Sequence, residues 1–227
     1  MTTQRPRRTA AVVLAIAAAV ATGTMSALGP GTATAAPTCA DVHVVSARGT
    51  NEPGGMWNRF HLGTVVGNPV YAAVDDALSG TVDAYRVEYP ASLDQPASVQ
   101  KGNRDLVDHV VEQAATCPDQ RFVLVGYSQG ANVVDNAIGI SSAGAKVGGP
   151  IVATLPPQLE ARIAAILLFG NPIRGIGKEV TGPYAERTFD VCNDNDPVCD
   201  PDGTDWNVHT RYARHAGAAA EFVTARI

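Results

Sequence analysis

The sequence Phe122-Val123-Leu124-Val125-Gly126-Tyr127-Ser128-Gln129-Gly130 joins two hydrophobic patterns at a glycine-rich turn. Its first four residues are the most strand-like run in the chain, and residues 131–140 carry apolar side chains at helical spacing. A Gly-x-Ser-x-Gly turn between a strand and a helix is typical of a serine lifted above a sheet edge, where the helix N-terminus favours negative charge. We therefore predict that Ser128 is a nucleophile.

Further apolar runs extend this pattern along the chain. Strands are expected at residues 42–45, 81–87, 122–125, 163–169 and 188–191, and helices at residues 70–78, 98–115, 131–140 and 211–226. Continuous apolar runs separated by helices are typical of parallel strands buried on both faces, with crossover helices on both sides. We predict an α/β fold, a three-layer sandwich around a central, mostly parallel sheet of five strands. Reactive groups should collect at the carboxyl ends of these strands.

Residues 1–36 have the composition of a cleaved export signal. Three Arg precede an uncharged run rich in Ala, Val and Leu, and a stretch of small residues ends at position 36. The apolar run is shorter than a membrane span of about 20 apolar residues, although an uncleaved anchor remains the alternative. The Arg7-Arg8 pair leaves the export route open. We expect a secreted protein whose mature part, residues 37–227, is one catalytic domain without a membrane span.

The charge of the mature chain limits its partners. The full sequence has 17 Lys and Arg against 22 Asp and Glu, and removal of the three Arg in residues 1–36 leaves a net charge of −8. Such a surface repels nucleic acid and anionic lipid headgroups, so neither is expected as a main partner. About 190 residues are enough for one buried core and short for two. We expect a monomer.

All cysteines of the chain lie in the mature part, at Cys39, Cys117, Cys192 and Cys199. An even number of cysteines in an exported chain indicates disulfides, here two, and four cysteines allow three pairings. Six residues separate Cys192 from Cys199. Because paired zinc ligands are usually separated by two to four residues, a structural zinc site is not expected.

A nucleophilic serine needs a base, and the base needs an acid that holds its tautomer. The expected order after this kind of turn is Ser, then Asp or Glu, then His. Only His209 and His215 follow Ser128, and the three earlier histidines are interpreted as structural or surface residues. Spacing alone does not choose among the candidate acids, which include Asp190, Asp194, Asp196, Asp200, Asp202 and Asp205.

Asp196 has the best local setting among these acids. It precedes Pro197, which favours an extended backbone before it, and it lies between Cys192 and Cys199. A disulfide across these cysteines would close a tight ring and fix the direction of the carboxylate. Chain-entropy estimates give about 2.5 kcal/mol for closing this ring and about 4.5 kcal/mol for a bond from Cys39 to Cys117. The short bond would therefore serve mainly for local positioning.

Together these motifs resemble the cutinase family of serine esterases. The resemblance is carried by Gly126-Tyr127-Ser128-Gln129-Gly130, the segment from Cys192 to Cys199, His209-Thr210-Arg211-Tyr212, Ala47-Arg48-Gly49-Thr50 and Cys117-Pro118. It covers essentially the whole mature chain from about Cys39, and this order of motifs is far more specific than the pentapeptide alone.

The resemblance implies an α/β-hydrolase-like fold and a reaction that needs no metal or cofactor. No long insertion between the motifs indicates a helical lid, so we expect an open site without a lid domain. The site residues that it implies are a triad of Ser128, Asp196 and His209, an oxyanion hole at the Gln129 N–H and at Thr50, and the disulfides Cys39–Cys117 and Cys192–Cys199. His209 is preferred to His215 because it lies in the loop before the last predicted helix, in a His-x-x-Tyr sequence that occurs in the family. Many cutinases have serine where this chain has Thr50.

The function implied is hydrolysis of carboxylic esters, with cutin-like polyesters or short to medium acyl esters as substrates. The alternative with the same chemistry is an acetylxylan esterase. The segment Glu88-Tyr89-Pro90-Ala91 is similar to sequences of that group. The alternative of another class is a non-catalytic cell-wall or carbohydrate-binding protein. Trp57, Trp206 and the loops around Leu93 and Val208 are as consistent with packing as with an acyl groove, so they receive no role.

Overall fold

The computed structural model describes residue 1 and residues 39–227. Residues 2–38, which include nearly all of the predicted export signal, lie outside the described residues, so that signal stays a prediction. Residues 39–227 belong to one compact unit. Its strands are all parallel, in the order β2-β1-β3-β4-β5. Their bounds are β1 Val42–Ala47, β2 Val82–Arg86, β3 Arg121–Tyr127, β4 Ile163–Phe169 and β5 Thr188–Val191.

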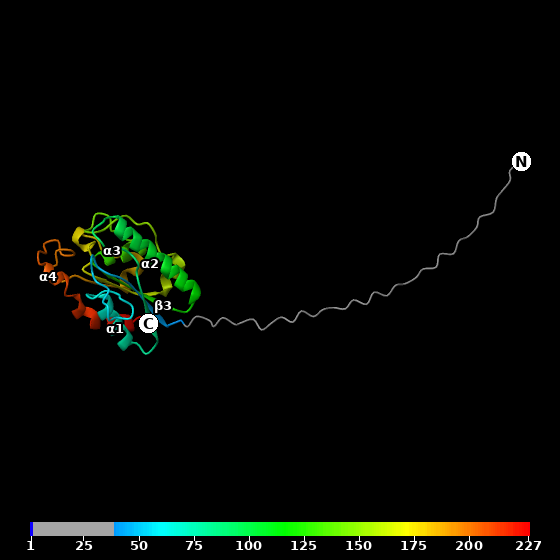
Figure 1. The fold of residues 1–227 in the computed structure, drawn as a ribbon, viewed down its shortest axis with the longest axis horizontal. Coiled ribbons are helices and arrows are strands. Elements are labelled where there is room, and N and C mark those ends of the chain that lie inside the picture. Colours follow the sequence, from blue (N-terminus) through cyan, green and yellow to red (C-terminus); the bar gives the residue numbers. More distant parts are fainter. Residues whose placement is uncertain (2–38) are drawn as a thin grey trace. The chain divides into compact units, whose positions relative to one another are not determined.

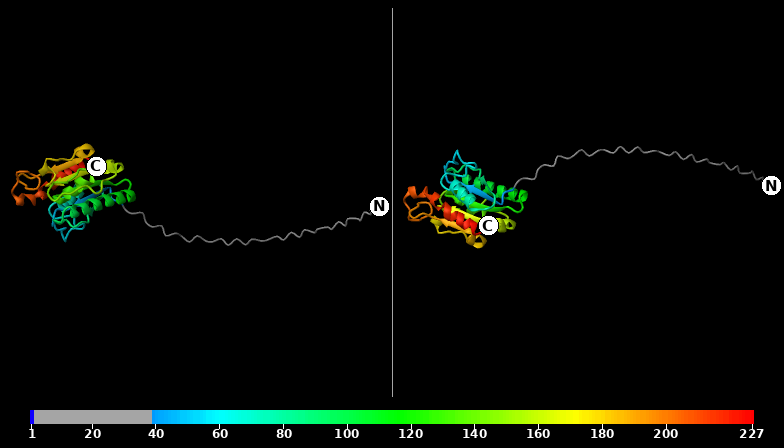
Figure 2. Two further views of the ribbon diagram at one scale, coloured as in Figure 1. Left: turned by 90° about the horizontal axis from the view of Figure 1, so that it is seen from above. Right: turned by 90° about the horizontal axis from the view of Figure 1, so that it is seen from below.

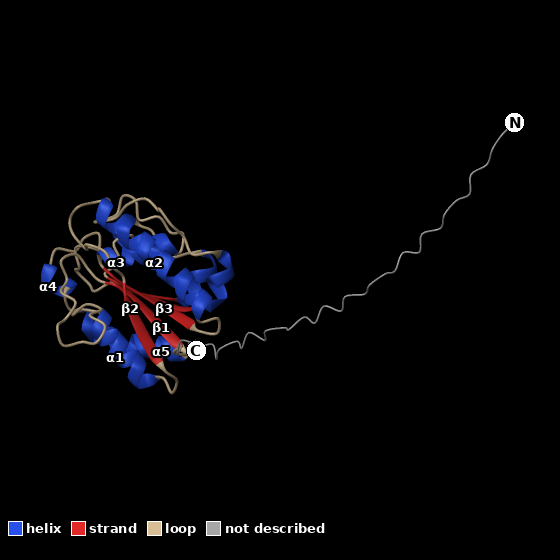
Figure 3. Ribbon diagram, turned by 45° about the vertical axis from the view of Figure 1, so that its right-hand side comes forward, coloured by secondary structure: helices blue, strands red, loops and turns tan. Residues whose placement is uncertain are grey.

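Helices cover both faces of this sheet and complete the predicted three-layer α/β sandwich. One layer contains α1 (Gly67–Ala77) and α5 (Ala216–Thr224), and the other contains α2 (Ala97–Thr116) and α3 (Gln129–Ala137), as Figures 1 and 3 show. The views in Figure 2 show the orange segment, which includes the short helix α4 (Trp206–His209), at one end of this domain. Within residues 39–227, no helix combines the length and apolar character needed to span a bilayer.

The remaining helical turns are 3₁₀ turns in the connections, at η1 Pro157–Arg162, η2 Arg174–Ile176, η3 Gly182–Arg187 and η4 Tyr212–His215.

Each central strand supplies side chains to two separate cores, which explains why its sequence is continuously apolar. In β3, Phe122 and Leu124 point into the core beneath α2 and α3, whereas Val123 and Val125 point into the core beneath α1 and α5. Alternate residues of a strand face opposite sides of a sheet, so both sets must be hydrophobic when helices cover both faces. The prediction of buried parallel strands is thereby confirmed.

Two predicted helices differ from the observed ones. Residues 131–140 were expected to be helical, but α3 starts at Gln129 and ends at Ala137, because Gly139 takes a left-handed φ of 90°. The expected helix at residues 211–226 is divided into η4 and α5. The side chains of η4 bond to residues 193 and 196, and these contacts fix the turn against the loop after β5.

Candidate active site

Ser128 occupies a tight turn between β3 and α3, with φ of 54° and ψ of −117°. This left-handed backbone is unusual for serine and is typical of strain at functional sites. A β-carbon on Gly126 would lie 2.6 Å from the Gly130 carbonyl oxygen, and one on Gly130 would lie 1.9 Å from that of Ala47. Glycine is therefore required on both sides of the serine, because α3 approaches β3 closely at Gly126 and β1 closely at Gly130.

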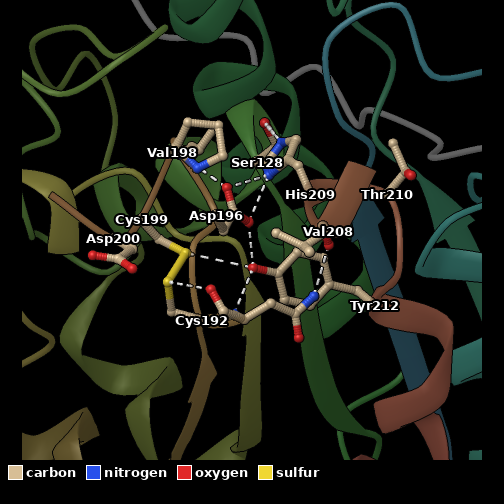
Figure 4. Close-up of polar contacts among 12 residues, drawn as sticks. Ser128, Cys192, Asp196, Val198, Cys199, Asp200, Val208, His209, Thr210 and Tyr212 are labelled. Atoms are coloured by element: carbon tan, nitrogen blue, oxygen red, sulfur yellow. Dashed lines mark hydrogen bonds and ion pairs between the residues drawn. A yellow bond between two sulfur atoms is a disulfide. The ribbon is translucent and has the colours of Figure 1, made fainter. Parts of the chain in front are cut away.

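Ser128, His209 and Asp196 form a continuous hydrogen-bonded chain at the carboxyl edge of the sheet (Figure 4). His209 Nε2 lies 3.0 Å from Ser128 Oγ, and Nδ1 lies 2.9 and 2.8 Å from the two carboxylate oxygens of Asp196. The three residues are 6%, 7% and 0% exposed, in that order. With Nδ1–H donating to the carboxylate, Nε2 is left to accept the serine hydrogen. The arrangement can therefore withdraw a proton from Ser128.

Two further donors hold the Asp196 carboxylate. The Val198 N–H donates to Oδ1 at 2.8 Å, and the Tyr212 hydroxyl donates to Oδ2 at 2.5 Å. Burial raises the pKa of Asp196, but the hydrogen bonds from His209, Tyr212 and Val198 outweigh burial and hold the pKa below its ordinary value. Burial raises the pKa of Tyr212, so the phenol stays protonated and remains a donor.

The Cys192–Cys199 disulfide closes the loop that carries Asp196, and Tyr212 lies against it (Figure 4). The hydroxyl of Tyr212 accepts from the Asn193 N–H at 3.0 Å and lies 3.4 Å from Cys199 Sγ. The other disulfide joins Cys39 to Cys117 at the end of α2. Both bonds have the pairing that the resemblance implied.

The Gln129 side chain holds Thr50 beside the start of α3. Gln129 Nε2 donates to Thr50 Oγ1 at 2.9 Å and to the Ser92 carbonyl at 2.8 Å, while Oε1 accepts from Ser98 Oγ at 2.7 Å. Because Thr50 Oγ1 accepts from the amide, its own hydrogen is available to another acceptor. The Gln129 N–H belongs to the first turn of α3, where backbone donors have no partner within the helix. Together these donors can receive an oxyanion.

The buried carboxylate of Glu52, which no sequence motif predicts, fixes the segment before Thr50. Glu52 accepts from the Gly49 N–H at 2.7 Å and from the Val65 N–H at 2.6 Å. Burial raises the pKa of Glu52, although these backbone bonds act in the opposite direction. A single Glu in a polar loop has no sequence pattern that would have identified this role.

A pocket of about 490 Å³ opens beside Ser128. Leu93 and Trp206 line it and are 71% and 61% exposed, so within the described residues no helical lid covers the entrance. Trp57 lines a different hollow, formed with residues 58–76. Val208 does not line the pocket beside Ser128, and its carbonyl accepts from Asn193 Nδ2 at 2.8 Å. The pocket beside Ser128 is also lined by Thr50, Tyr127, Lys146, Val147, Val198, His209 and Thr210.

A larger hollow of about 660 Å³ lies between α1 and α5. Its lining is mainly Ala and Gly, with Thr224 and the carboxylates Asp76 and Glu221. No histidine lines it, and the Thr224 hydroxyl donates to the Ala220 carbonyl and not to a carboxylate, so the volume alone does not make it a reaction site.

The other histidines have different partners. His215 Nε2 lies 2.9 Å from Asn193 Oδ1, which removes it as a rival base. His43 lies near the amino end of β1, where Nδ1 is 2.5 Å from Asp83 and Nε2 is 2.8 Å from His109 Nε2. These contacts agree with the structural interpretation of His43 and His109.

None of the other candidate acids bonds to His209. Asp205 caps the N-terminus of α4 by accepting from the Asn207 N–H, and Asp200 accepts from the Asn195 and Asp202 N–H groups. Asp190 accepts from Asn171, and Asp194 and Asp202 are exposed. Of the six carboxylates, only Asp196 bonds to His209.

Comparison with known proteins gives one consistent result. The family model described as cutinase matches residues 38–227. A cutinase from Kineococcus radiotolerans is 43% identical over 168 residues, which are 72% of this chain and 53% of that protein, so the chain spans about half the length of this relative. Phospholipase Culp4 of Mycobacterium tuberculosis is 36% identical over 225 residues, which are 97% of this chain and 92% of that protein.

Solved structures have the same fold. A Trichoderma reesei cutinase in complex with a phosphonate inhibitor superimposes with a TM-score of 0.64 and 31% identity, covering 82% of this chain and 76% of that one. The catalytic core of an acetylxylan esterase from Trichoderma reesei gives a TM-score of 0.70 and 25% identity, covering 84% of this chain and 100% of that one. The chain therefore belongs to the cutinase family of carboxylic ester hydrolases.

Proposed function

We propose that this protein is a secreted serine esterase of the cutinase type that uses Ser128, His209 and Asp196 as its triad. The observation that carries the proposal is the hydrogen-bonded chain from Ser128 Oγ through His209 to Asp196, with distances of 3.0, 2.8 and 2.9 Å. A strained serine beside an oriented imidazole is the arrangement that nucleophilic acyl transfer requires.

In the first half-reaction, Ser128 Oγ attacks the ester carbonyl carbon and its proton passes to His209 Nε2. The carbonyl oxygen becomes an oxyanion that accepts hydrogen bonds from the Gln129 N–H and from Thr50. The Asp196 carboxylate stabilises the imidazolium. When the tetrahedral intermediate collapses, the carbon–oxygen bond to the alcohol breaks, and the alcohol leaves with the proton from His209.

In the second half-reaction, water replaces the alcohol. His209 takes a proton from the water as the water oxygen attacks the acyl-enzyme carbonyl. Collapse breaks the bond to Ser128 Oγ, which recovers its hydrogen from His209, and the carboxylic acid leaves. The net change is one ester and one water converted into one acid and one alcohol, without an external oxidant or reductant.

The pocket supports acyl esters as substrates. Its volume of about 490 Å³ and the apolar side chains of Leu93, Val147, Val198 and Trp206 favour an acyl chain longer than acetyl. We propose cutin-like polyesters or short to medium acyl esters. A panel of p-nitrophenyl esters from acetate to palmitate, with acetylxylan alongside, tests this, and activity confined to acetate and acetylxylan would contradict it.

Acetylxylan esterase remains the second candidate because of one observation. The chain covers the whole catalytic core of the Trichoderma reesei acetylxylan esterase with a TM-score of 0.70. The same substrate panel separates the two activities.

Catalysis itself is tested with a serine-directed fluorophosphonate probe. The wild-type protein should be labelled, and Ser128→Ala should remove the label and lower kcat by about 10⁶-fold. An unlabelled wild-type protein of native fold would instead favour the non-catalytic cell-wall or carbohydrate-binding function.

Secretion is part of the proposal and rests on residues 1–36 and on the two disulfides, which form in oxidising compartments. N-terminal sequencing of the protein from the culture medium should give a chain that starts near Pro37. Recovery of the intact N-terminus in the cell fraction would contradict secretion.

A further inference from the structure

The pocket beside Ser128 contains one lysine and no arginine. Lys146 lines it together with Val147, Val198 and the side chains around the triad. Leu93, Val147, Val198 and Trp206 already give the pocket an apolar surface, so an ammonium group there is unnecessary for holding an acyl chain. Its presence needs a separate explanation.

Buried amides hold the loop that presents Lys146. Asn132 Nδ2 donates to the Lys146 carbonyl at 2.9 Å, and Asn136 Nδ2 donates to the Gly149 carbonyl at 3.1 Å. Asn136 Oδ1 also accepts from the Ser142 N–H at 2.9 Å. Asn132, Asn136 and Ser142 are fully buried. Polar groups inside a core are costly unless bonded, so these bonds give the loop a defined position.

The backbone and side chain at the tip of this loop are also constrained. Val147 has a φ of 47°, which is a rare conformation for a β-branched residue and persists only where surrounding contacts enforce it. The Lys146 ammonium donates to the Pro197 carbonyl, next to Asp196. One of its three hydrogens is used in this bond, so two remain for a ligand.

We propose that Lys146 is a specificity-determining residue that favours esters carrying an anionic oxygen group a few atoms from the scissile carbonyl. A carboxylate or a phosphodiester has this chemistry, and an ammonium group binds either as a point charge. The net negative charge of the protein acts at long range and is screened by salt, whereas Lys146 acts at contact. This inference rests on the proposed esterase function of the same pocket.

The test compares substrates of one acyl length. Values of kcat/KM are measured for p-nitrophenyl butyrate and p-nitrophenyl hemisuccinate, which differ in a terminal methyl or carboxylate. Dibutyroyl phosphatidylmethanol, whose headgroup carries only the phosphodiester charge, and tributyrin form the phosphodiester pair. In Lys146→Met, the charged-to-neutral ratio of kcat/KM should fall about fivefold in at least one pair, as expected for a partly exposed ion pair. The pair that responds identifies the anionic group.

Two variants control for charge and for loop structure. Lys146→Arg should keep the wild-type ratio. Lys178→Met removes another lysine that bonds to the same loop, through the Ser141 carbonyl at 3.0 Å, but it does not line the pocket and should leave the ratio unchanged. An unchanged ratio in Lys146→Met for both pairs, or a similar change in Lys178→Met, would overturn the proposal. Absence of hydrolysis of every ester by the wild type would instead reject the esterase function.

Discussion

The hydroxyl of Tyr212 lies 2.5 Å from Asp196 Oδ2, so a phenol donates to the carboxylate that orients His209. The same hydroxyl accepts from the Asn193 N–H at 3.0 Å, which ties it to the loop closed by Cys192–Cys199. Tyr212 is therefore a positioning residue that acts on the base through its acid.

Replacing Tyr212 by Phe should lower both kcat and stability. A hydrogen bond to a charged group contributes about 1.5 kcal/mol, which corresponds to about a tenfold loss of kcat if it is expressed fully in the transition state. Because Tyr212 helps to lower the pKa of Asp196, the lost stability should be greatest near neutral pH. It should diminish as pH falls through the folded pKa of Asp196, below about 4. Chemical denaturation from pH 3 to 8 measures this.

Tyr127→Phe is the matched control, because Tyr127 donates to the His209 carbonyl at 2.7 Å and not to the carboxylate. It should lose stability without the same dependence on pH. Identical pH dependence in the two variants would show that Tyr212 has only a packing role.

Replacing Thr50 by Val should remove a donor to the oxyanion while keeping the shape of the side chain. We expect kcat to fall by about 10²-fold, the usual effect of losing one oxyanion-hole donor, with little change in KM. Thr50→Ser keeps the hydroxyl bonded to Gln129 and should retain most activity. Steady-state kinetics on p-nitrophenyl butyrate distinguish these outcomes, and equal activity of the Val and Ser variants would exclude the hydroxyl as a donor.

Removing the Cys192–Cys199 disulfide should affect turnover more than stability. The double variant Cys192→Ser/Cys199→Ser loses about 2.5 kcal/mol by loop-closure entropy, but it also releases the loop that holds Asp196. The control Cys39→Ser/Cys117→Ser should lose about 4.5 kcal/mol and keep kcat at temperatures where it is folded. Thermal melts and kcat at 20 °C compare the two, and a smaller loss of kcat in the first variant would contradict the positioning role.

A buried pair of carboxyl groups should make the protein more stable at mildly acidic pH. Asp135 in α3 is fully buried, and neither carboxyl oxygen makes a hydrogen bond of normal length and angle with a described residue. Burial and the charge of Asp190 raise its pKa well above the ordinary value. Burial also raises the pKa of Asp190 to about 6, although Arg174 and Asn171 act in the opposite direction.

Because both carboxyl groups bind protons more tightly in the folded state, stability should decrease as pH rises from about 4, the unfolded pKa, through the folded values. Asp135→Asn keeps the size of the side chain and cannot ionise, so it should raise Tm at pH 8 and flatten the pH dependence. Melting curves at pH 4.5, 6 and 8 check this. If the Tm of Asp135→Asn differs from the wild-type Tm by the same amount at all three pH values, Asp135 does not ionise in this range.

The longest apolar runs were the easiest features to predict. Residues 163–169 coincide with β4, and residues 122–125 lie within β3. The sequence does not predict the short helix α4, because four residues are too few to show helical periodicity. Its N-terminal cap, Asp205, is one of several acidic residues in a polar segment and has no distinguishing pattern. The division of residues 211–226 was missed because η4 is fixed by contacts with residues 193 and 196.

By itself, the sequence determined the buried parallel sheet and the strained serine turn, since apolar periodicity and closely spaced glycines are local properties. Tertiary structure decided which groups meet that serine. His209 contacts it across 81 positions, and Asp196 contacts the histidine across 13. No local sequence pattern predicts the side-chain contacts of Gln129, Tyr212 and Lys146. Those contacts depend on how separate loops converge at the carboxyl edge of one sheet.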